Sequence, residues 1–104
     1  MHRQAVSDFQ QRCYDVLARV PAGRVTTYSE IPKALGSRAS RAVGTAMARN
    51  SQLVTIPCHR VVRSDGSVGE YALGQQEKTA LLMREGITIS KGKVVDFEQL
   101  VYRF

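Results

Sequence analysis

The residues best suited to chemistry lie in the segment Pro-Cys-His-Arg-Val at positions 57–61, between a mainly apolar run at 53–56 and a turn-rich loop at 64–69. This order places the thiol of Cys58 at the lip of a buried segment, where a substrate can reach it from one side. An imidazole and a guanidinium follow the thiol directly, and cationic neighbours lower a thiol pKa. The segment therefore predicts a thiolate nucleophile. The alternative is that Cys58 is a small buried apolar side chain, which is the commoner fate of a free cysteine.

The net charge of +6 is concentrated in the part of the chain that carries this thiol. Between Ile31 and Ser64 there is no aspartate or glutamate, and the rest of the chain carries equal numbers of acidic and basic residues. The basic residues of the segment are Lys33, Arg38, Arg41, Arg49, Arg60 and Arg63. A basic face of this kind is typical of proteins that bind a phosphate backbone. The alternative is a basic surface that only keeps the protein soluble.

The length of 104 residues predicts one compact domain over 1–104, because two domains with separate cores need a longer chain. Two cysteines and two histidines without a CxxC pair argue against a disulfide framework and a metal site. No apolar run approaches the length that crosses a bilayer, and residues 1–11 lack the apolar stretch of a signal peptide. We therefore expect no metal and no membrane partner, in a reducing cytoplasm or with DNA in the nucleoid or nucleus. The sequence gives no signal of an oligomer, and a monomer is expected.

The elements that must position the thiol begin with a helix over 8–19. Ser7 and Gln10 have the spacing of a capping box at its start. One face of the helix carries an apolar stripe of Phe9, Cys13, Val16, Leu17 and Val20. Cys13 is therefore expected in the core.

Two further helices are spaced as in a helix-turn-helix. Thr27 and Glu30 form a second capping signature, which opens a short helix that runs to Leu35 and ends at Gly36. A third helix is expected over 38–49. Its inward residues are expected to be Ala39, Val43, Ala46 and Met47.

The outward face of this third helix carries Arg41, Gly44, Thr45 and Ala48 at helical spacing. Small side chains let a helix backbone come close to a partner, as in the narrow minor groove of DNA. A helix that reads the major groove usually projects longer polar side chains. Close packing of two helices inside the domain would produce the same pattern, and the sequence leaves both readings open.

The remainder of the chain predicts a loop over 63–74, a helix over 75–85 and a hairpin over 87–95 that turns at Lys91-Gly92. Leu81 and Leu82 are expected to face inward, and a last short turn is expected over 97–102. The fold class predicted is mainly α, a winged helix-turn-helix-like single domain with a small C-terminal β-hairpin.

Several motifs stand in a characteristic order along the chain. They are Gly23-Arg24-Val25-Thr26-Thr27-Tyr28, Arg41-Ala42-Val43-Gly44, Asn50, Ile56-Pro57-Cys58-His59-Arg60-Val61-Val62 and Gly69-Glu70-Tyr71. In this order they resemble the O6-alkylguanine-DNA alkyltransferases, which repair DNA by removing alkyl groups from the exocyclic oxygen of guanine. The resemblance extends over essentially the whole chain and is to the catalytic, DNA-binding domain of that family.

The resemblance implies a catalytic set of Cys58, His59, Glu85 and Tyr28. Cys58 would accept the alkyl group, and His59 would draw off the thiol proton through a water. Glu85 would hold His59 in the required tautomer. Tyr28 would press on the adjoining phosphate and donate a proton or hydrogen bond to the departing guanine.

The resemblance also implies a DNA contact surface and a substrate pocket. Arg41 would enter the duplex and fill the space left by a flipped-out nucleotide. Together with the basic segment and the small-residue face, this gives a DNA-binding set of Arg41, Tyr28, Gly44, Thr45, Ala48, Arg49 and Arg60. The pocket set is Asn50, Tyr71, Ala72 and Val61, in which Asn50 would brace the turn beside the thiol. Lys78 falls where the family has a structural lysine.

The function predicted is direct, irreversible transfer of a methyl or other alkyl group from O6-alkylguanine in duplex DNA to Cys58, without a cofactor. No group in the sequence can reverse the thioether, so each molecule would act once. Alkyltransferase-like proteins are the alternative: they are similarly short, bind damaged bases and signal to another repair pathway. They usually carry tryptophan in place of the acceptor, so Cys58 favours transfer. Leu73 departs from the small residues usual in the family and could reshape the pocket mouth.

Two other classes remain as alternatives. A plain winged-helix regulator would prefer a DNA sequence and ignore alkylation. A hydrolase that uses Cys58 with His59 is disfavoured, because adjacent residues on a strand point to opposite sides.

Overall fold

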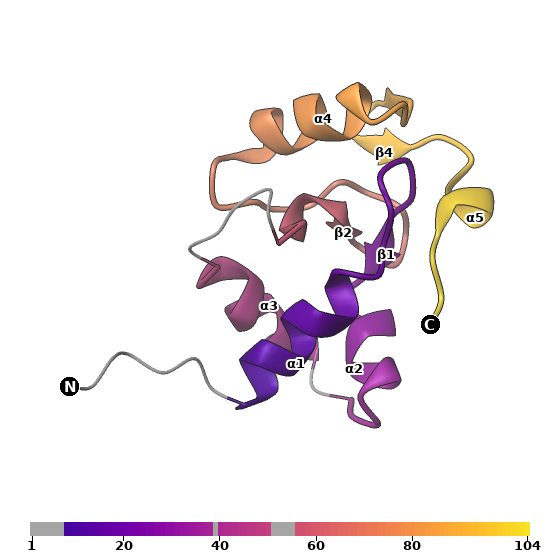
Figure 1. Cartoon of the computed structure of the whole chain (residues 1–104). Helices are drawn as coiled ribbons and strands as arrows, with labels where there is room; N and C mark the ends of the chain where they lie inside the picture. Colours follow the sequence, from indigo (N-terminus) through magenta and orange to yellow (C-terminus); the bar gives the residue numbers. More distant parts are fainter. Residues whose placement is uncertain (1–7, 39, 51–55) are drawn as a thin grey trace.

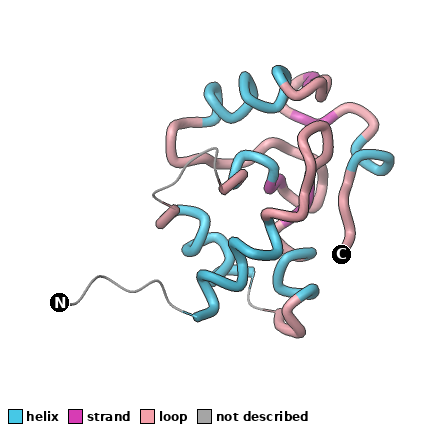
Figure 2. Tube along the Cα trace, viewed as in Figure 1, coloured by secondary structure: helices cyan, strands magenta, loops and turns pink. Residues whose placement is uncertain are grey.

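The computed structural model describes residues 8–38, 40–50 and 56–104, and the chain is mainly helical, as predicted. The elements in chain order are α1 (Asp8–Leu17), β1 (Thr26–Thr27), α2 (Glu30–Ala34), α3 (Ser40–Ala48), the 3-10 helix η1 (Cys58–Arg60), β2 (Val61–Val62), α4 (Gln75–Arg84), β3 (Ile89–Ser90), β4 (Lys93–Val94) and α5 (Phe97–Leu100). Figure 1 shows α1, α2 and α3 gathered at one end and α4 at the other, with η1, β1 and β2 between them. Figure 2 shows how little of the described chain is strand.

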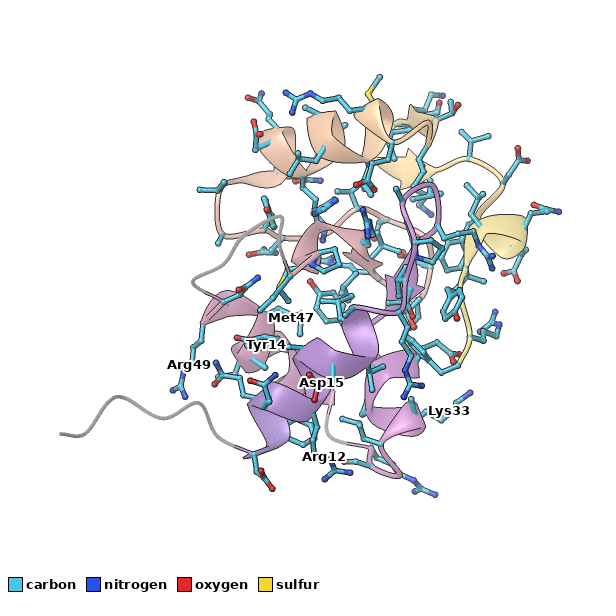
Figure 3. All side chains as sticks on the ribbon, viewed as in Figure 1. Arg12, Tyr14, Asp15, Lys33, Met47 and Arg49 are labelled. Carbon is cyan, nitrogen blue, oxygen red and sulfur yellow. The ribbon has the colours of Figure 1, made fainter. Side chains whose placement is uncertain are left out.

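Helix α1 packs against α2 and α3 through the apolar stripe that the sequence predicts. Cys13 and Leu17 are fully buried on that stripe, which confirms Cys13 as a core residue. The helix ends at Leu17, two residues earlier than predicted. The Ser7 half of the predicted capping box lies outside the described residues. Figure 3 shows Tyr14 and Met47 where α1 meets α3, and the Tyr14 hydroxyl donates to the carbonyl of Ala46 at 2.7 Å.

The second capping signature forms only in part. The Oγ1 of Thr27 accepts the backbone N–H of Glu30 at 3.1 Å, but α2 begins at Glu30 and its N-cap residue is Ser29, not Thr27. The Glu30 carboxylate does not return to the backbone, because it accepts hydrogen bonds from Lys33 and Arg103. After α2 the chain turns at Gly36, whose φ of +71° suits glycine. The two helices predicted here, α2 and α3, are thus present as two short helices.

Helix α3 begins at Ser40, two residues later than predicted. Val43, Ala46 and Met47 are buried as expected, and Ala39 lies outside the described residues.

Strands β1 and β2 pair in parallel, with Thr26 opposite Val61 and Thr27 opposite Val62, which the sequence did not predict. Val61 packs into the core shared by the first three helices, and Val62 packs into a second core beneath α4. Alternate residues of a strand face opposite sides, so this short ladder joins the two cores. The turn at Cys58 is therefore anchored by the strand that follows it.

The C-terminal hairpin forms as predicted, with Ile89 opposite Val94 and Ser90 opposite Lys93. Its turn residues Lys91 and Gly92 both have positive φ, the geometry of a type I′ turn.

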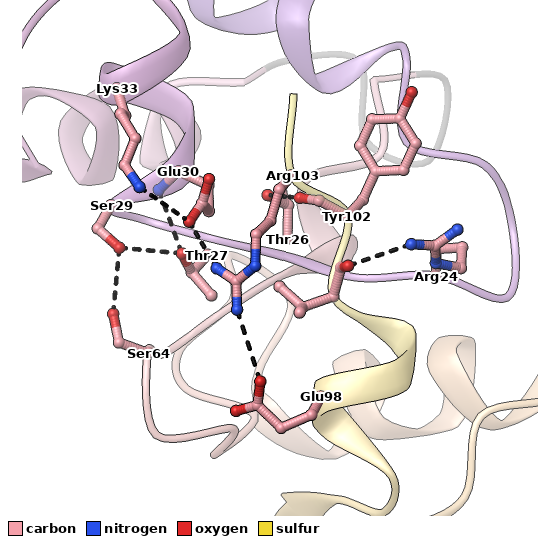
Figure 4. A network of polar contacts seen from close by, with 11 residues as sticks. Arg24, Thr26, Thr27, Ser29, Glu30, Lys33, Ser64, Glu98, Tyr102 and Arg103 are labelled. Atoms are coloured by element: carbon pink, nitrogen blue, oxygen red, sulfur yellow. Dashed lines mark hydrogen bonds and ion pairs between the residues drawn. The ribbon is translucent and has the colours of Figure 1, made fainter.

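The last residues bind back onto the start of β1. The backbone N–H of Tyr102 donates to the carbonyl of Val25 at 2.6 Å. Figure 4 shows the polar contacts around this segment, among them Arg103 to Glu30 at 2.7 Å. No helix in the described ranges is both long enough and apolar enough to cross a bilayer.

Candidate active site

Cys58 lies on the wall of a cavity of about 180 Å³ between α3 and the loop that precedes α4. The cavity is lined by Tyr28, Gly44, Met47, Ala48, Cys58, Glu70, Tyr71 and Ala72. Cys58 is only 4% exposed, so its thiol is deeper than the lip position that the sequence predicted. The predictions that Tyr71 and Ala72 lie at a pocket beside the thiol agree with this geometry. Val61, which we also predicted there, is fully buried in the core and does not line the cavity.

Asn50 holds the turn that presents the thiol. Its Nδ2 donates to the carbonyl of Ile56 at 3.1 Å and to the Sγ of Cys58 at 2.9 Å. Asn50 is buried and directly follows the last turn of α3. The side chain therefore fixes the thiol relative to the helix that forms one wall of the cavity.

The expectation of a lowered thiol pKa is wrong. Burial raises the pKa of Cys58 to about 11, although the Asn50 hydrogen bond and the charge of Lys78 act in the opposite direction. The imidazole and guanidinium that follow Cys58 do not offset this, because both bind Glu85 instead. The resting thiol is consequently protonated at neutral pH.

His59 is fully buried, and its Nε2 lies 2.9 Å from the Oε2 of Glu85. A carboxylate oxygen can only accept, so Nε2 carries the proton and Nδ1 is the basic nitrogen of the neutral ring. That Nδ1 is buried and has no hydrogen-bond partner among the described residues. Glu85 itself caps the end of α4 at Arg84, rather than lying within the helix as predicted.

Arg60, which the sequence assigned to DNA contact, binds Glu85 within the protein. Its Nε and Nη2 donate to the two carboxylate oxygens at 3.0 and 2.7 Å, and its Nη1 donates to the carbonyl of Val20 at 2.8 Å. Desolvation acts to raise the pKa of Glu85, but the hydrogen bonds and charges of Arg60 and His59 outweigh it, so this pKa is lowered. The sequence missed this pairing, because the partners are far apart in the chain.

Lys78 is fully buried beneath the cavity. Its Nζ donates to the backbone carbonyl of Glu70 at 3.0 Å and lies 5.8 Å from the centre of the Tyr28 ring. Burial lowers the pKa of Lys78 to about 8, while the neighbouring thiol acts to raise it. Burial also raises the pKa of Tyr28, and the nearby thiol adds to this effect. The amine of Lys78 and the phenol of Tyr28 therefore both interact electrostatically with the thiol of Cys58.

The outward face of α3 is exposed at Arg41, Thr45 and Ala48, as predicted, and Arg49 next to it is exposed too. Figure 3 shows Arg49 projecting away from the body of the protein. Apart from its chain neighbours and the backbone of its own helix, no described atom lies within 4 Å of a Cβ built on Gly44. Packing against another described element does not explain this glycine, and the exposed face remains available to a partner.

Sequence reasoning missed two residues of the cavity. Met47 was assigned only to the core, and Glu70 was given no role, although it stands next to Tyr71 in the loop. Leu73, expected at the pocket mouth, is 57% exposed and is not among the lining residues. Within the described ranges, no three side chains of histidine, cysteine, aspartate or glutamate gather closely enough to hold a metal ion.

Residues 8–87 match the family profile described as 6-O-methylguanine DNA methyltransferase, DNA binding domain. The chain belongs to this family. A methylated-DNA–protein-cysteine methyltransferase of Methanothermobacter thermautotrophicus is 41% identical over 83 residues, which are 80% of this chain and 47% of that protein. A bifunctional methyltransferase/endonuclease of Picrophilus torridus is 42% identical over 98 residues, 93% of this chain and 32% of its own length. The chain thus spans about a third to a half of these relatives.

Among solved structures, Schizosaccharomyces pombe Atl1 in complex with DNA containing O6-carboxymethylguanine superposes with a TM-score of 0.83 at 27% identity. The match covers 97% of this chain and 100% of Atl1. This neighbour is as short as the present chain.

Proposed function

We propose that this protein binds duplex DNA carrying O6-alkylguanine, takes the flipped base into the cavity and transfers the alkyl group to the Sγ of Cys58. The observation that carries this proposal is the position of that thiol in the wall of a cavity whose other side is the exposed, small-residue face of α3. The names of the relatives support the reaction, and the complex of Atl1 with damaged DNA supports the binding mode.

The first step of the proposed reaction removes the thiol proton. At a pKa of about 11 the thiol needs a base, and the unpartnered Nδ1 of His59 supplies one through a bridging water. The resulting imidazolium is stabilised by the carboxylate of Glu85 at 2.9 Å. The cation of Lys78 and the amide of Asn50 favour the thiolate as it forms.

The second step is an in-line displacement at the alkyl carbon. A bond forms from Sγ to this carbon while the bond from the carbon to O6 breaks, and the electron pair passes to the guanine. The Tyr28 hydroxyl keeps its proton at neutral pH, since burial raises its pKa further above the ordinary value of 10.0, so it can donate to the departing base. The thioether product has no leaving group of comparable quality, so one molecule acts once.

DNA binding is assigned to α2 and α3 as a helix-turn-helix, with the C-terminal hairpin as a small wing. Arg41 enters the base stack where the nucleotide has left it, and Arg49 contacts phosphate. Gly44, Thr45 and Ala48 let the backbone approach the minor groove. A monomer acting wherever the DNA lies, in the cytoplasm, nucleoid or nucleus, is sufficient for this chemistry.

The direct test is the intact mass of the protein after incubation with a duplex that contains one O6-methylguanine. We expect a gain of one CH2 per molecule, confined to the peptide that contains Cys58. Cys13 is an internal control, since it is fully buried in the core and should stay unmodified. Tight binding of the lesion with an unmodified Cys58 would contradict transfer.

A lesion sensor is the second candidate function. The full-length match to Atl1 and the raised pKa of the Cys58 thiol favour it. A sensor would keep its affinity for alkylated DNA and its protective effect in cells when Cys58 is replaced by serine. A transferase would lose protection in Cys58→Ser while its affinity for the lesion persisted.

A further inference from the structure

Glu70 is the one acidic residue among those that line the thiol cavity in the described part of the chain. The backbone of its loop is held in place, because the buried Nζ of Lys78 donates to the backbone carbonyl of Glu70 at 3.0 Å. Gly69 precedes it with a φ of +77°, and a Cβ there would lie 3.4 Å from the Arg63 side chain. The backbone conformation therefore holds Glu70 at this wall.

Glu70 also lines a second, more open cavity of about 350 Å³ on the other side of the loop. That cavity is lined by Arg63, Ser67, Gly69, Glu70, Tyr71, Gly74 and Gln75. Glu70 and Tyr71 are common to both cavities, so they form the wall between them. A charge on Glu70 consequently acts on whatever occupies the cavity that contains the thiol.

The Glu70 side chain is exposed, and its negative charge is partly offset by the nearby cation of Lys78. Its carboxylate makes no hydrogen bond or ion pair with any residue that the structure describes, and the nearby Lys78 amine is bound to the backbone carbonyl. The charge nevertheless reaches the site, because it helps to raise the pKa of both Tyr28 and Lys78. A carboxylate that has no direct ion pair and lies beside a confined ligand repels a second negative charge.

We propose that Glu70 is a specificity-determining residue that makes the cavity accept neutral alkyl adducts of guanine and reject anionic ones. This inference rests on the proposed function, since it concerns the group that the flipped base brings into the cavity. An O6-methyl group adds no charge to the base. An O6-carboxymethyl group adds a carboxylate to the base. Inside the cavity this carboxylate and that of Glu70 would repel each other, which disfavours binding.

The experiment compares two duplexes that differ only in the adduct, one with O6-methylguanine and one with O6-carboxymethylguanine. Affinity is measured for both by competition with unmodified duplex, and alkyl transfer is measured separately by mass. In the wild-type protein we expect the methyl adduct to bind more tightly by about tenfold or more. Glu70→Gln should reduce this ratio by about tenfold, chiefly by improving binding of the carboxymethyl adduct.

Glu98→Gln is the matched control, because it removes the same charge from an exposed position on α5, which does not line the thiol cavity. It should leave the ratio of the two affinities unchanged. If Glu70→Gln also leaves that ratio unchanged while the methyl adduct is still bound above unmodified DNA, the inference is overturned and the proposed function stands. If the wild-type protein binds neither adduct above unmodified DNA, both the proposed function and this inference fail.

Discussion

The guanidinium of Arg60 donates hydrogen bonds to both carboxylate oxygens of Glu85, with Nε 3.0 Å from Oε1 and Nη2 2.7 Å from Oε2. The same Oε2 lies 2.9 Å from the Nε2 of His59. Arg60 is also bound to the carbonyl of Val20, just beyond α1. A bidentate arginine of this kind fixes the direction of a carboxylate, and here it fixes the carboxylate that orients the imidazole beside the thiol.

Replacing Arg60 by methionine should slow alkyl transfer by about tenfold or more, because Glu85 would no longer hold His59 in one orientation. Hydrogen bonds from Arg60 lower the pKa of Glu85, so this pKa should rise in the variant. The carboxylate would then be protonated at a higher pH, and the rate should fall earlier as the pH is lowered. Single-turnover rates measured across the acid range test this.

Arg60→Lys is the matched comparison for that prediction, since lysine keeps the positive charge but cannot bind both carboxylate oxygens with a planar guanidinium. Its rate should fall between those of the wild-type protein and Arg60→Met. Equal pH profiles in all three proteins would contradict a role for Arg60 in positioning Glu85.

The stability of the protein should rise between pH 8 and 9 because of Lys78. Its pKa is about 8 in the folded protein against 10.5 for an ordinary lysine, so in this window the unfolded chain binds a proton that the folded protein does not. The free energy of unfolding then increases with pH, by about 1 kcal/mol per unit at most. Cys58 has the opposite effect between pH 9 and 11, because its pKa is about 11 instead of 9.0.

Urea unfolding at closely spaced pH values tests this expectation. The wild-type curve should rise from pH 8 to 9, level off where the two groups oppose each other and fall above about pH 10.5. Lys78→Met should lack the rise, and Cys58→Ser should keep it and continue upward past pH 9. A rise that persists in Lys78→Met would mean that another group causes it.

Arg41→Ala should separate base flipping from general DNA binding. The loss of the inserted side chain should leave a few kcal/mol of unstacking energy without compensation, so alkyl transfer at saturating DNA should slow markedly. Affinity for undamaged duplex should fall only modestly. Fluorescence of a base analogue opposite the lesion reports flipping directly.

Arg49→Ala is the control for Arg41, because Arg49 is exposed beside the same face and is assigned to phosphate contact. It should reduce the dependence of log affinity on log salt by about one unit, and it should not slow transfer once DNA saturates the protein. An unchanged transfer rate in Arg41→Ala would remove that residue from the flipping step.

Gly44 allows stability and function to be tested separately. A Cβ on this residue meets no described atom within 4 Å outside its chain neighbours and the backbone of its own helix, so Gly44→Ala should stabilise α3 by about 0.5–1 kcal/mol. Gly44→Leu should fold equally well but weaken binding of alkylated DNA, since the residue lines the cavity at the proposed DNA face. A Gly44→Leu variant that is folded and binds the lesion normally would contradict the proposed approach of α3 to DNA.

The sequence by itself determined the features that depend on neighbours in the chain. The apolar stripe of α1 predicted the burial of Cys13, and Lys91-Gly92 predicted the turn between β3 and β4. Helix periodicity and turn geometry are set within a few residues, so the sequence displays them directly.

Only the tertiary structure decided the properties that depend on which distant segments meet. It buried Cys58 and so raised a thiol pKa that the adjacent cations were expected to lower. It paired Arg60 with Glu85, and it brought Glu70 to the wall of the thiol cavity. Desolvation and charge pairing are set by distance in space, and a linear order of residues does not contain those distances.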